Sequence, residues 1–133
     1  MELALGISLI TVLLIGATEF GRLAYASIEI AEAAHTGAEY GSQNHTAAAD
    51  TANMKLAATQ SAPDVKGMTA TATRTCTCAN GTASTCLAGD CSHSRLIEYV
   101  QVKTTAAVDP LIYVPGLPKS YSIQSQATMV VVQ

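Results

Sequence analysis

The sequence predicts an α+β protein with a long N-terminal hydrophobic helix, a short second helix and a three-stranded antiparallel sheet with a disulfide-stapled loop. Three observations lead to this fold class. An uncharged apolar run lies near the start of the chain, three later segments alternate in polarity with a period of two, and four cysteines cluster from the end of the first of those segments onward. A chain of 133 residues is long enough for such a helix and one small globular domain.

The apolar run covers 16 residues, Leu3 to Thr18, between Glu2 and Glu19. As a helix it would be about 24 Å long, somewhat short of the roughly 30 Å of a hydrocarbon core. It can be interpreted as a single-span anchor, as a secretory signal peptide, or as a helix that leaves the membrane to pack with copies of itself. A signal peptide fits poorly because no Lys or Arg precedes the run.

Helical spacing continues beyond Glu19 to about residue 43. The whole element, about residues 3 to 43, would be a helix of roughly 60 Å. Its first half would be apolar on every face and its second half amphipathic. We therefore divide the chain into a helical part, residues 1–43, and a small head, residues 44–133. The apolar face expected in the second half consists of Phe20, Leu23, Ala24, Ile28, Ala31, Ala34 and Ala38.

In the head, residues 46–60 are alanine-rich and predict the second helix, with Thr46 as its N-cap. Alternating, β-branched sequences at residues 68–76, 97–105 and 120–132 predict the three strands. Asp109-Pro110 begins the break between the last two strands.

The four cysteines are Cys76, Cys78, Cys86 and Cys91, and they surround an Asn-Gly turn. An even number in so short a segment predicts two disulfides in an oxidising compartment. A bridge between Cys76 and Cys78 would be strained, which leaves 76–86 with 78–91, or the nested 76–91 with 78–86. The nested pairing is slightly preferred. Zinc binding with His93 is an alternative, but the spacing is not that of a standard zinc finger, so no metal is expected.

Composition and motifs argue against two classes of function. The net charge is −3 and no Lys/Arg cluster is present, which argues against nucleic-acid binding. None of His35, His45 and His93 belongs to a recognisable catalytic motif, and no phosphate-binding loop occurs, so we expect neither an enzyme nor a cofactor. Charged residues make up only 13% against a usual value of about 25%, so we expect apolar surface to be covered by a membrane or a partner.

The stretch GATEFGRLAYASIEIAEAAHTGAEYG resembles the N-terminal signature of TadE-like proteins, pilin-like components of tight-adherence (Flp) pilus systems. The segments CTCANGTASTCLAGDC, YVQVKTTAAV and SIQSQATMVVV are similar to the cysteine-containing β portion of many such domains. The resemblance implies a pilin-like fold, processing by a prepilin peptidase, export through the inner membrane, and assembly into or alongside a pilus.

Five residues are candidates for assembly contacts. In pilins a carboxylate near the start of the chain can pair with the buried N-terminal ammonium of a neighbouring subunit, and Glu2 is the candidate for this role. Glu19 and Arg22 can meet on one helix face, either as an assembly contact or as a boundary of the membrane segment. Gly6 and Gly16 are small enough to allow close helix approach, as are Ser8, Thr11 and Ala17.

The preferred function is therefore that of a structural subunit of an extracellular pilus filament, stored in the inner membrane before assembly. Its expected partners are copies of itself in a helical filament, the inner membrane, the prepilin peptidase and the assembly machinery. Two alternatives are a minor pseudopilin that primes or caps the pilus, and a single-pass membrane-anchored binding module.

Overall fold

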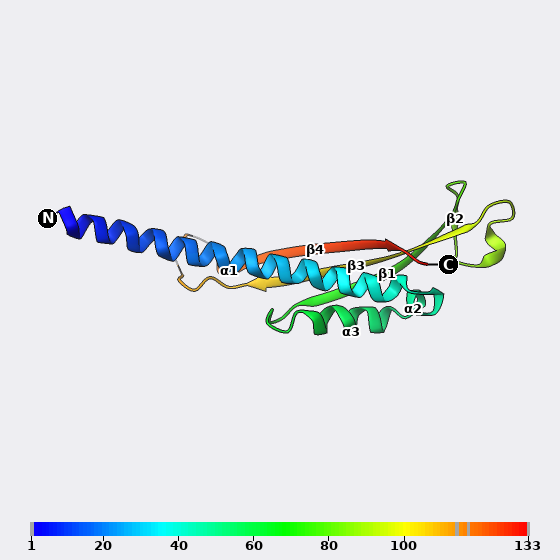
Figure 1. Ribbon diagram of the computed structural model, residues 1–133, viewed down its shortest axis with the longest axis horizontal. Helices are drawn as coiled ribbons and strands as arrows, with labels where there is room; N and C mark the ends of the chain where they lie inside the picture. The colour runs from blue at the N-terminus through cyan, green and yellow to red at the C-terminus, as the bar shows by residue number, and fades with distance from the viewer. Residues whose placement is uncertain (1, 114, 117, 133) are drawn as a thin grey trace.

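The computed structural model describes residues 2–113, 115–116 and 118–132, without the side chains of residues 2–5 and 88. The molecule is elongated: helix α1 (Glu2–Ser42) projects from one end and runs along a twisted sheet for the rest of its length (Figure 1). The head adds the following elements: α2 (His45–Ala49), α3 (Thr51–Ser61), β1 (Thr69–Cys78), β2 (Ala83–Ser84), a 3-10 turn η1 (Ala88–Asp90), β3 (Leu96–Val108) and β4 (Tyr121–Val130).

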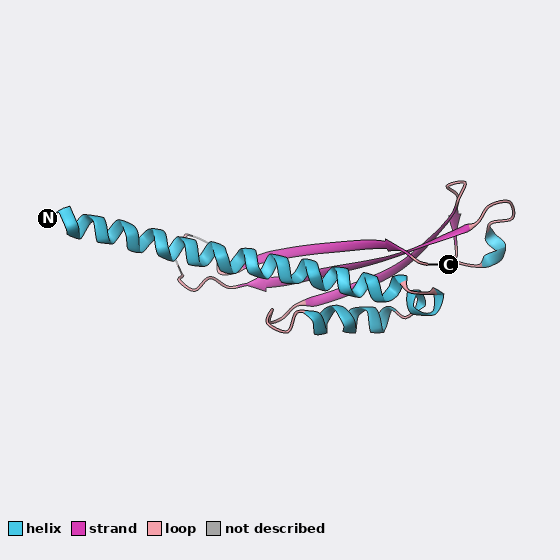
Figure 2. Ribbon diagram, in the orientation of Figure 1, coloured by secondary structure: helices cyan, strands magenta, loops and turns pink. Residues whose placement is uncertain are grey.

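The sheet is antiparallel throughout, with the strand order β2-β1-β3-β4. Helices α1 and α3 lie against one face of it, with α1 over β3 and β4 and α3 over β1 (Figure 2). The three predicted strands correspond to β1, β3 and β4. The expectation of three strands is nevertheless wrong, because the chain after Cys78 turns back and its residues Ala83–Ser84 add a fourth strand to β1.

The second helix is also different from the prediction, since it consists of two helices. Asn44 caps α2 by accepting a hydrogen bond from the backbone N–H of Ala47 at 2.9 Å, and Asp50 caps α3 by accepting one from Asn53 N–H at 3.0 Å. Thr46 is therefore not the N-cap. Asp50 both ends α2 and begins α3, because its carboxylate satisfies amide groups at the start of a new helix.

The core is built from small side chains. Val100 and Val102 of β3 face Ala34 and Ala38 of α1, with Met54 of α3 filling the space between the helices and the sheet. The hydroxyl of Thr104, on the same face of β3, donates to the carbonyl oxygen of Ile30 at 2.7 Å. The inward side chains of β3 therefore fix both the depth and the direction of α1 on the sheet.

Helix α1 approaches α3 closely where its inward residue is glycine. A Cβ placed on Gly37 would lie 2.8 Å from the carbonyl oxygen of Met54 and 3.0 Å from Cβ of Ala58. No larger residue fits between these two backbones without a shift, so Gly37 sets the distance between the two helices.

The face of α1 that packs on the head is only partly the predicted one. Ala34 and Ala38 are buried as expected, but Phe20 is 74% exposed and Ile28 is 68% exposed. The residues that contact the head are mostly small and include Ala26, Ala33 and Gly37, together with the larger Ile30. The side of α1 that faces the sheet is thus lined mostly by small side chains, which allow a close approach, whereas Ile28 points away from the head.

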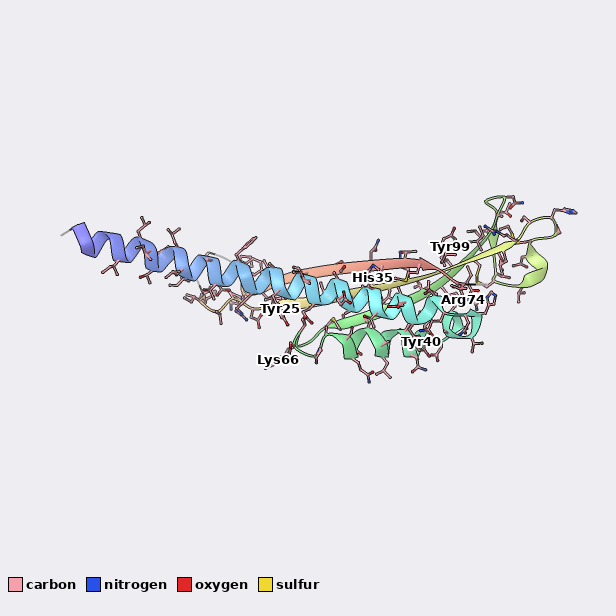
Figure 3. All side chains as sticks on the ribbon, viewed as in Figure 1. Tyr25, His35, Tyr40, Lys66, Arg74 and Tyr99 are labelled. Carbon is pink, nitrogen blue, oxygen red and sulfur yellow. A yellow bond between two sulfur atoms is a disulfide. The ribbon has the colours of Figure 1, made fainter. Side chains whose placement is uncertain are left out.

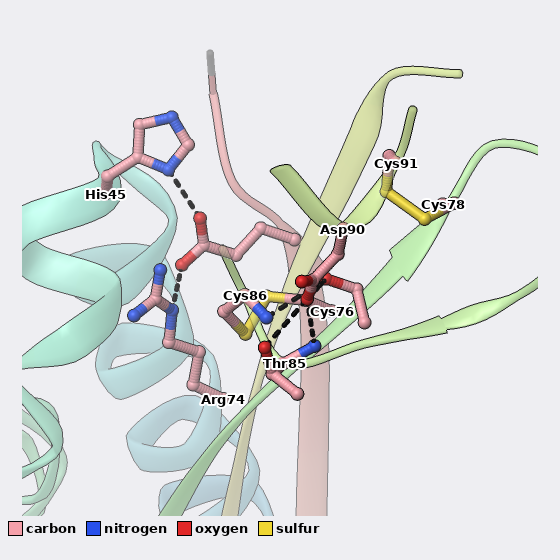
Figure 4. Close-up of a disulfide and its surroundings, with 10 residues drawn as sticks. His45, Arg74, Cys76, Cys78, Thr85, Cys86, Asp90 and Cys91 are labelled. Carbon is pink, nitrogen blue, oxygen red and sulfur yellow. Dashed lines mark hydrogen bonds and ion pairs between the residues drawn. A yellow bond between two sulfur atoms is a disulfide. The ribbon is translucent and has the colours of Figure 1, made fainter. Parts of the chain in front are cut away.

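The cysteines form two disulfides, Cys76–Cys86 and Cys78–Cys91, with Cα–Cα distances of 5.1 and 5.5 Å (Figure 4). The preference for the nested pairing is therefore wrong, and the loop is held by two disulfides. The reason lies in the fourth strand, whose register places Ser84 opposite Cys76 and so brings Cys86 close to the same cysteine. Because all four sulfur atoms are in disulfides, none is available to zinc as a thiolate.

Candidate assembly helix and its junction with the head

The N-terminal part of α1 exposes its apolar side chains in every direction (Figure 3). Within the described residues, one helix is long and apolar enough to cross a membrane, judged by length and composition, and its candidate segment begins at Gly6. This part of α1 projects beyond the head, which leaves its surface open. The exposed large side chains are Ile7, Leu9, Ile10, Val12, Leu13, Leu14 and Ile15.

The two candidate glycines lie on this open part of α1. A Cβ placed on Gly6 or Gly16 would meet no described atom within 4 Å, so packing within the chain does not require glycine at either position. Their role in close approach to another helix stays a prediction. Glu2 is the first residue of α1, and the role predicted for its side chain lies outside the side chains that the structure describes.

The structure brings Glu19 and Arg22 together, with 3.7 Å between Arg22 Nη1 and Glu19 Oε2. The other carboxylate oxygen of Glu19 makes a contact that the sequence did not predict. It accepts hydrogen bonds from the backbone N–H groups of Leu111, at 2.5 Å, and Ile112, at 3.3 Å. Glu19 therefore joins α1 to the loop between β3 and β4, in addition to marking the end of the apolar run.

A hollow of about 300 Å³ lies at the same junction. Its walls come from α1, through Ile15, Phe20 and Leu23, and from the β3–β4 loop, through Pro110 and Ile112. Apolar residues of the head thus lie beside the last turn of the uncharged run and the turn that follows it.

A second polar cluster, also missed by the sequence reasoning, lies at the opposite end of the head. Glu98 of β3 is fully buried and holds an ion pair with Arg74 of β1. Its other oxygen lies 2.5 Å from Nδ1 of His45, at the start of α2 (Figure 4). Both partners approach the carboxylate from the edge of the core, where Arg74 is partly and His45 more than half exposed.

The alternation of inward and outward side chains along β3 could have predicted this cluster. Glu98 shares its side of the strand with Val100 and Val102, so an inward charge follows from the alternation alone. A carboxylate at a buried position requires a cationic or hydrogen-bonding partner. Which partner it finds depends on pairing across β1 and β3, where Cys76 stands opposite Glu98 and Arg74 lies two residues away on the same side.

Asp90 organises the disulfide loop. Its Oδ2 accepts hydrogen bonds from the hydroxyl and backbone N–H of Thr85, both at 2.7 Å, and from the Ser84 hydroxyl at 2.9 Å (Figure 4). These bonds, the Thr85 hydroxyl first, hold the pKa of Asp90 below its ordinary value. The carboxylate thus ties β2 to the 3-10 turn between the two disulfides.

Because the folded protein lowers the pKa of Asp90, its contribution to stability is present above the pKa of the unfolded chain and is lost as the pH falls through the folded value. We expect the melting temperature of the native protein to fall more steeply below about pH 4 than that of Asp90→Asn. Thermal unfolding of both full-length chains across this pH range checks the difference. Parallel pH profiles would contradict it.

Comparison with known protein families gives one result. Residues 1–39 match the family model of the TadE-like protein. The chain is TadE-like over its N-terminal helix. The TadE-like segment contains all five candidate assembly residues and ends within α1, so the similarity noted for the cysteine-containing half stays a prediction. No curated protein and no solved structure matched the chain.

The match and the exposed apolar helix agree on a coarse assignment. TadE-like proteins are associated with the Tad pilus, and α1 has the character of a membrane anchor. The comparison therefore relates residues 1–39 to the Tad pilus, and the length and composition of α1 relate the same helix to a membrane.

Proposed function

We propose that this protein is a structural subunit of an extracellular Tad (Flp) pilus filament, which assembles through α1 after a stage in the inner membrane. The proposal rests on one observation: apolar exposure on α1 continues beyond the uncharged run, on the side turned away from the head. Ile28 lies nine residues past Glu19 and is 68% exposed, at a position where a simple membrane anchor has no need of a large exposed apolar residue.

Packing between copies of the protein would bury the exposed apolar surface of α1. Within a filament the uncharged run would exchange lipid for the helices of neighbouring subunits and stay in apolar surroundings, and Phe20 and Ile28 would bury against adjacent copies. The proposed work of the protein is association, with no chemical reaction. Its partners are copies of itself, the prepilin peptidase and the assembly machinery.

The test separates filament packing from membrane anchoring by substituting Ile28, which lies outside the uncharged run. We expect Ile28→Lys to reduce incorporation into sheared fibres by about tenfold or more, since moving the lysine charge from water into an apolar contact between subunits costs more than the 1.4 kcal/mol that corresponds to tenfold. The introduced lysine would stand four residues before Glu32 on the same face of the helix, so the substitution does not weaken the helix itself. The measurement is quantitative immunoblotting of sheared extracellular material and of the membrane fraction.

Leu87→Lys is the matched control, because Leu87 is 66% exposed but lies in the disulfide loop, at the other end of the head. We expect this variant to enter fibres normally. Normal fibre entry of Ile28→Lys would overturn the filament proposal and favour the anchored module. A native protein that is scarce in fibres but alters their number when deleted would instead be a minor pseudopilin.

A further inference from the structure

We propose that the β3–β4 loop, through residues 110–113, is a second membrane contact, inserted into the interfacial region of the bilayer beside α1. The occupant of this surface is the lipid bilayer itself. The inference rests on the membrane stage of the proposed function and says nothing about the filament. It gives the head a fixed height and orientation on the membrane before assembly.

The β3–β4 loop lies at the end of the head from which α1 projects (Figure 1). Ile112 and Ile15 line the same hollow, and Ile15 belongs to the uncharged run, three residues before its end. A bilayer that surrounds α1 as far as Thr18 therefore reaches the depth of Ile112.

The loop exposes large apolar side chains. Leu111 is 61% exposed, and Ile112 and Tyr113 are each about half exposed. Phe20 on α1 adds a large exposed ring close by, as a wall of the same hollow. Aromatic side chains such as those of Tyr113 and Phe20 are suited to the boundary between lipid and water, where tyrosine in particular is enriched.

The backbone at the start of the loop leaves no N–H group without an acceptor at residues 110–112. Pro110 has no N–H group, and the N–H groups of Leu111 and Ile112 both donate to Oε1 of Glu19. Three consecutive positions thus present no unpaired N–H. A loop in water has no need of this arrangement, whereas an unpaired N–H in lipid costs several kcal/mol.

The apolar surface of the loop also lengthens the part of the molecule that lipid can surround. The uncharged run is about 24 Å long, which falls short of a hydrocarbon core of roughly 30 Å. Phe20 and Leu23 continue the apolar surface on α1 past Glu19, and the loop adds Leu111 and Ile112 beside it. Glu19 lies between these two apolar surfaces with its carboxylate engaged by the loop and by Arg22, so its charge is partly compensated at this depth.

The chain contains no tryptophan, so single-tryptophan variants report depth without background from native indoles. We would place Leu111→Trp, Val12→Trp and Leu87→Trp, each in the full chain, in nanodiscs with or without brominated phospholipids. All three positions are exposed, so each indole fits without repacking. The Val12→Trp variant reports insertion of α1, Leu111→Trp reports the loop, and Leu87→Trp reports the far end of the head.

We expect brominated lipid to quench the indoles of Val12→Trp and Leu111→Trp and to leave that of Leu87→Trp unchanged, with a blue-shifted emission for Leu111→Trp in lipid. Quenching at position 12 without quenching at position 111 would overturn the loop contact and leave the membrane stage intact. Absence of quenching at position 12 would overturn both. Quenching of all three variants would also overturn the proposal, since the head would then lie on the bilayer without a preferred end.

A second variant tests Glu19 as the positioning residue. In the Leu111→Trp background, Glu19→Ala removes the acceptor for both N–H groups and should weaken the quenching of the loop indole, whereas Glu19→Gln keeps an acceptor oxygen and should retain most of it. The same changes in the Val12→Trp background should leave quenching unaltered. Equal quenching of the loop indole with Glu, Ala or Gln at position 19 would overturn the role of Glu19.

Discussion

Replacement of Arg74 by Leu is expected to lower the free energy of unfolding by about 3 kcal/mol, because it leaves the buried carboxylate of Glu98 without its cationic partner. Glu98 is fully buried, whereas Arg74 retains some exposure, so the cost falls at the lower end of values for a broken buried pair. His45 stays within hydrogen-bonding reach but is itself more than half exposed. The measurement is urea-induced unfolding of the full chain in detergent micelles.

The double variant Arg74→Leu with Glu98→Leu separates loss of the pair from loss of packing. Removing both charges takes away the unpaired group, so we expect the double variant to be more stable than the single one. Lys103→Leu is a suitable control, since Lys103 lies on the exposed side of β3. A single Arg74 variant within about 0.5 kcal/mol of the native protein would show that the carboxylate is well solvated without its partner.

Substitution of Gly37 by Val is expected to destabilise the head by about 3 kcal/mol, at the upper end of the cost of overpacking. The added Cβ would lie 2.8 Å from a backbone oxygen of α3, and the γ carbons would add further clashes with Ala58 and Val102. Neither helix can yield without leaving the sheet, since α1 also bonds to Thr104 through the carbonyl of Ile30. The same urea titration measures the loss.

Gly21→Val is the matched control, because it makes the same change in the same helix at a position where a Cβ meets no described atom within 4 Å. Valine is a better helix former than glycine by a few tenths of a kcal/mol, so this variant should be neutral or slightly stabilised. Equal effects of the two substitutions would mean that helix propensity, and not the approach of α3, decides the role of Gly37.

Several elements could be predicted because their signals are local. The uncharged run and the helical spacing after it predict α1, and period-two alternation predicts β1, β3 and β4 at nearly their observed positions. The clustered cysteines predict two disulfides, but their pairing depends on β2, a strand of two residues that carries no periodic signal of its own. The alanine-rich composition of residues 46–60 predicts one helix. Composition gives no weight to Asp50, whose side chain caps α3 and so divides the segment into two helices.

The contacts at the two ends of the head could not be predicted in the same way. Glu19 meets Leu111 across 92 positions of sequence, and Glu98 meets His45 across 53. The face of α1 predicted from helical spacing was only partly right, because packing on the sheet buries the side that carries Ile30 and leaves Phe20 and Ile28 exposed.

The sequence by itself determined the apolar helix, the strands, the cysteine cluster and the TadE-like signature, because each depends on neighbouring residues and their periodicity. Only the tertiary structure decided the disulfide pairing, the partners of Glu98 and the attachment of the β3–β4 loop to Glu19. Those contacts depend on strand register and on how closely α1 can approach the sheet. Side chains distant in sequence meet only after the backbone has been placed to within a few ångströms.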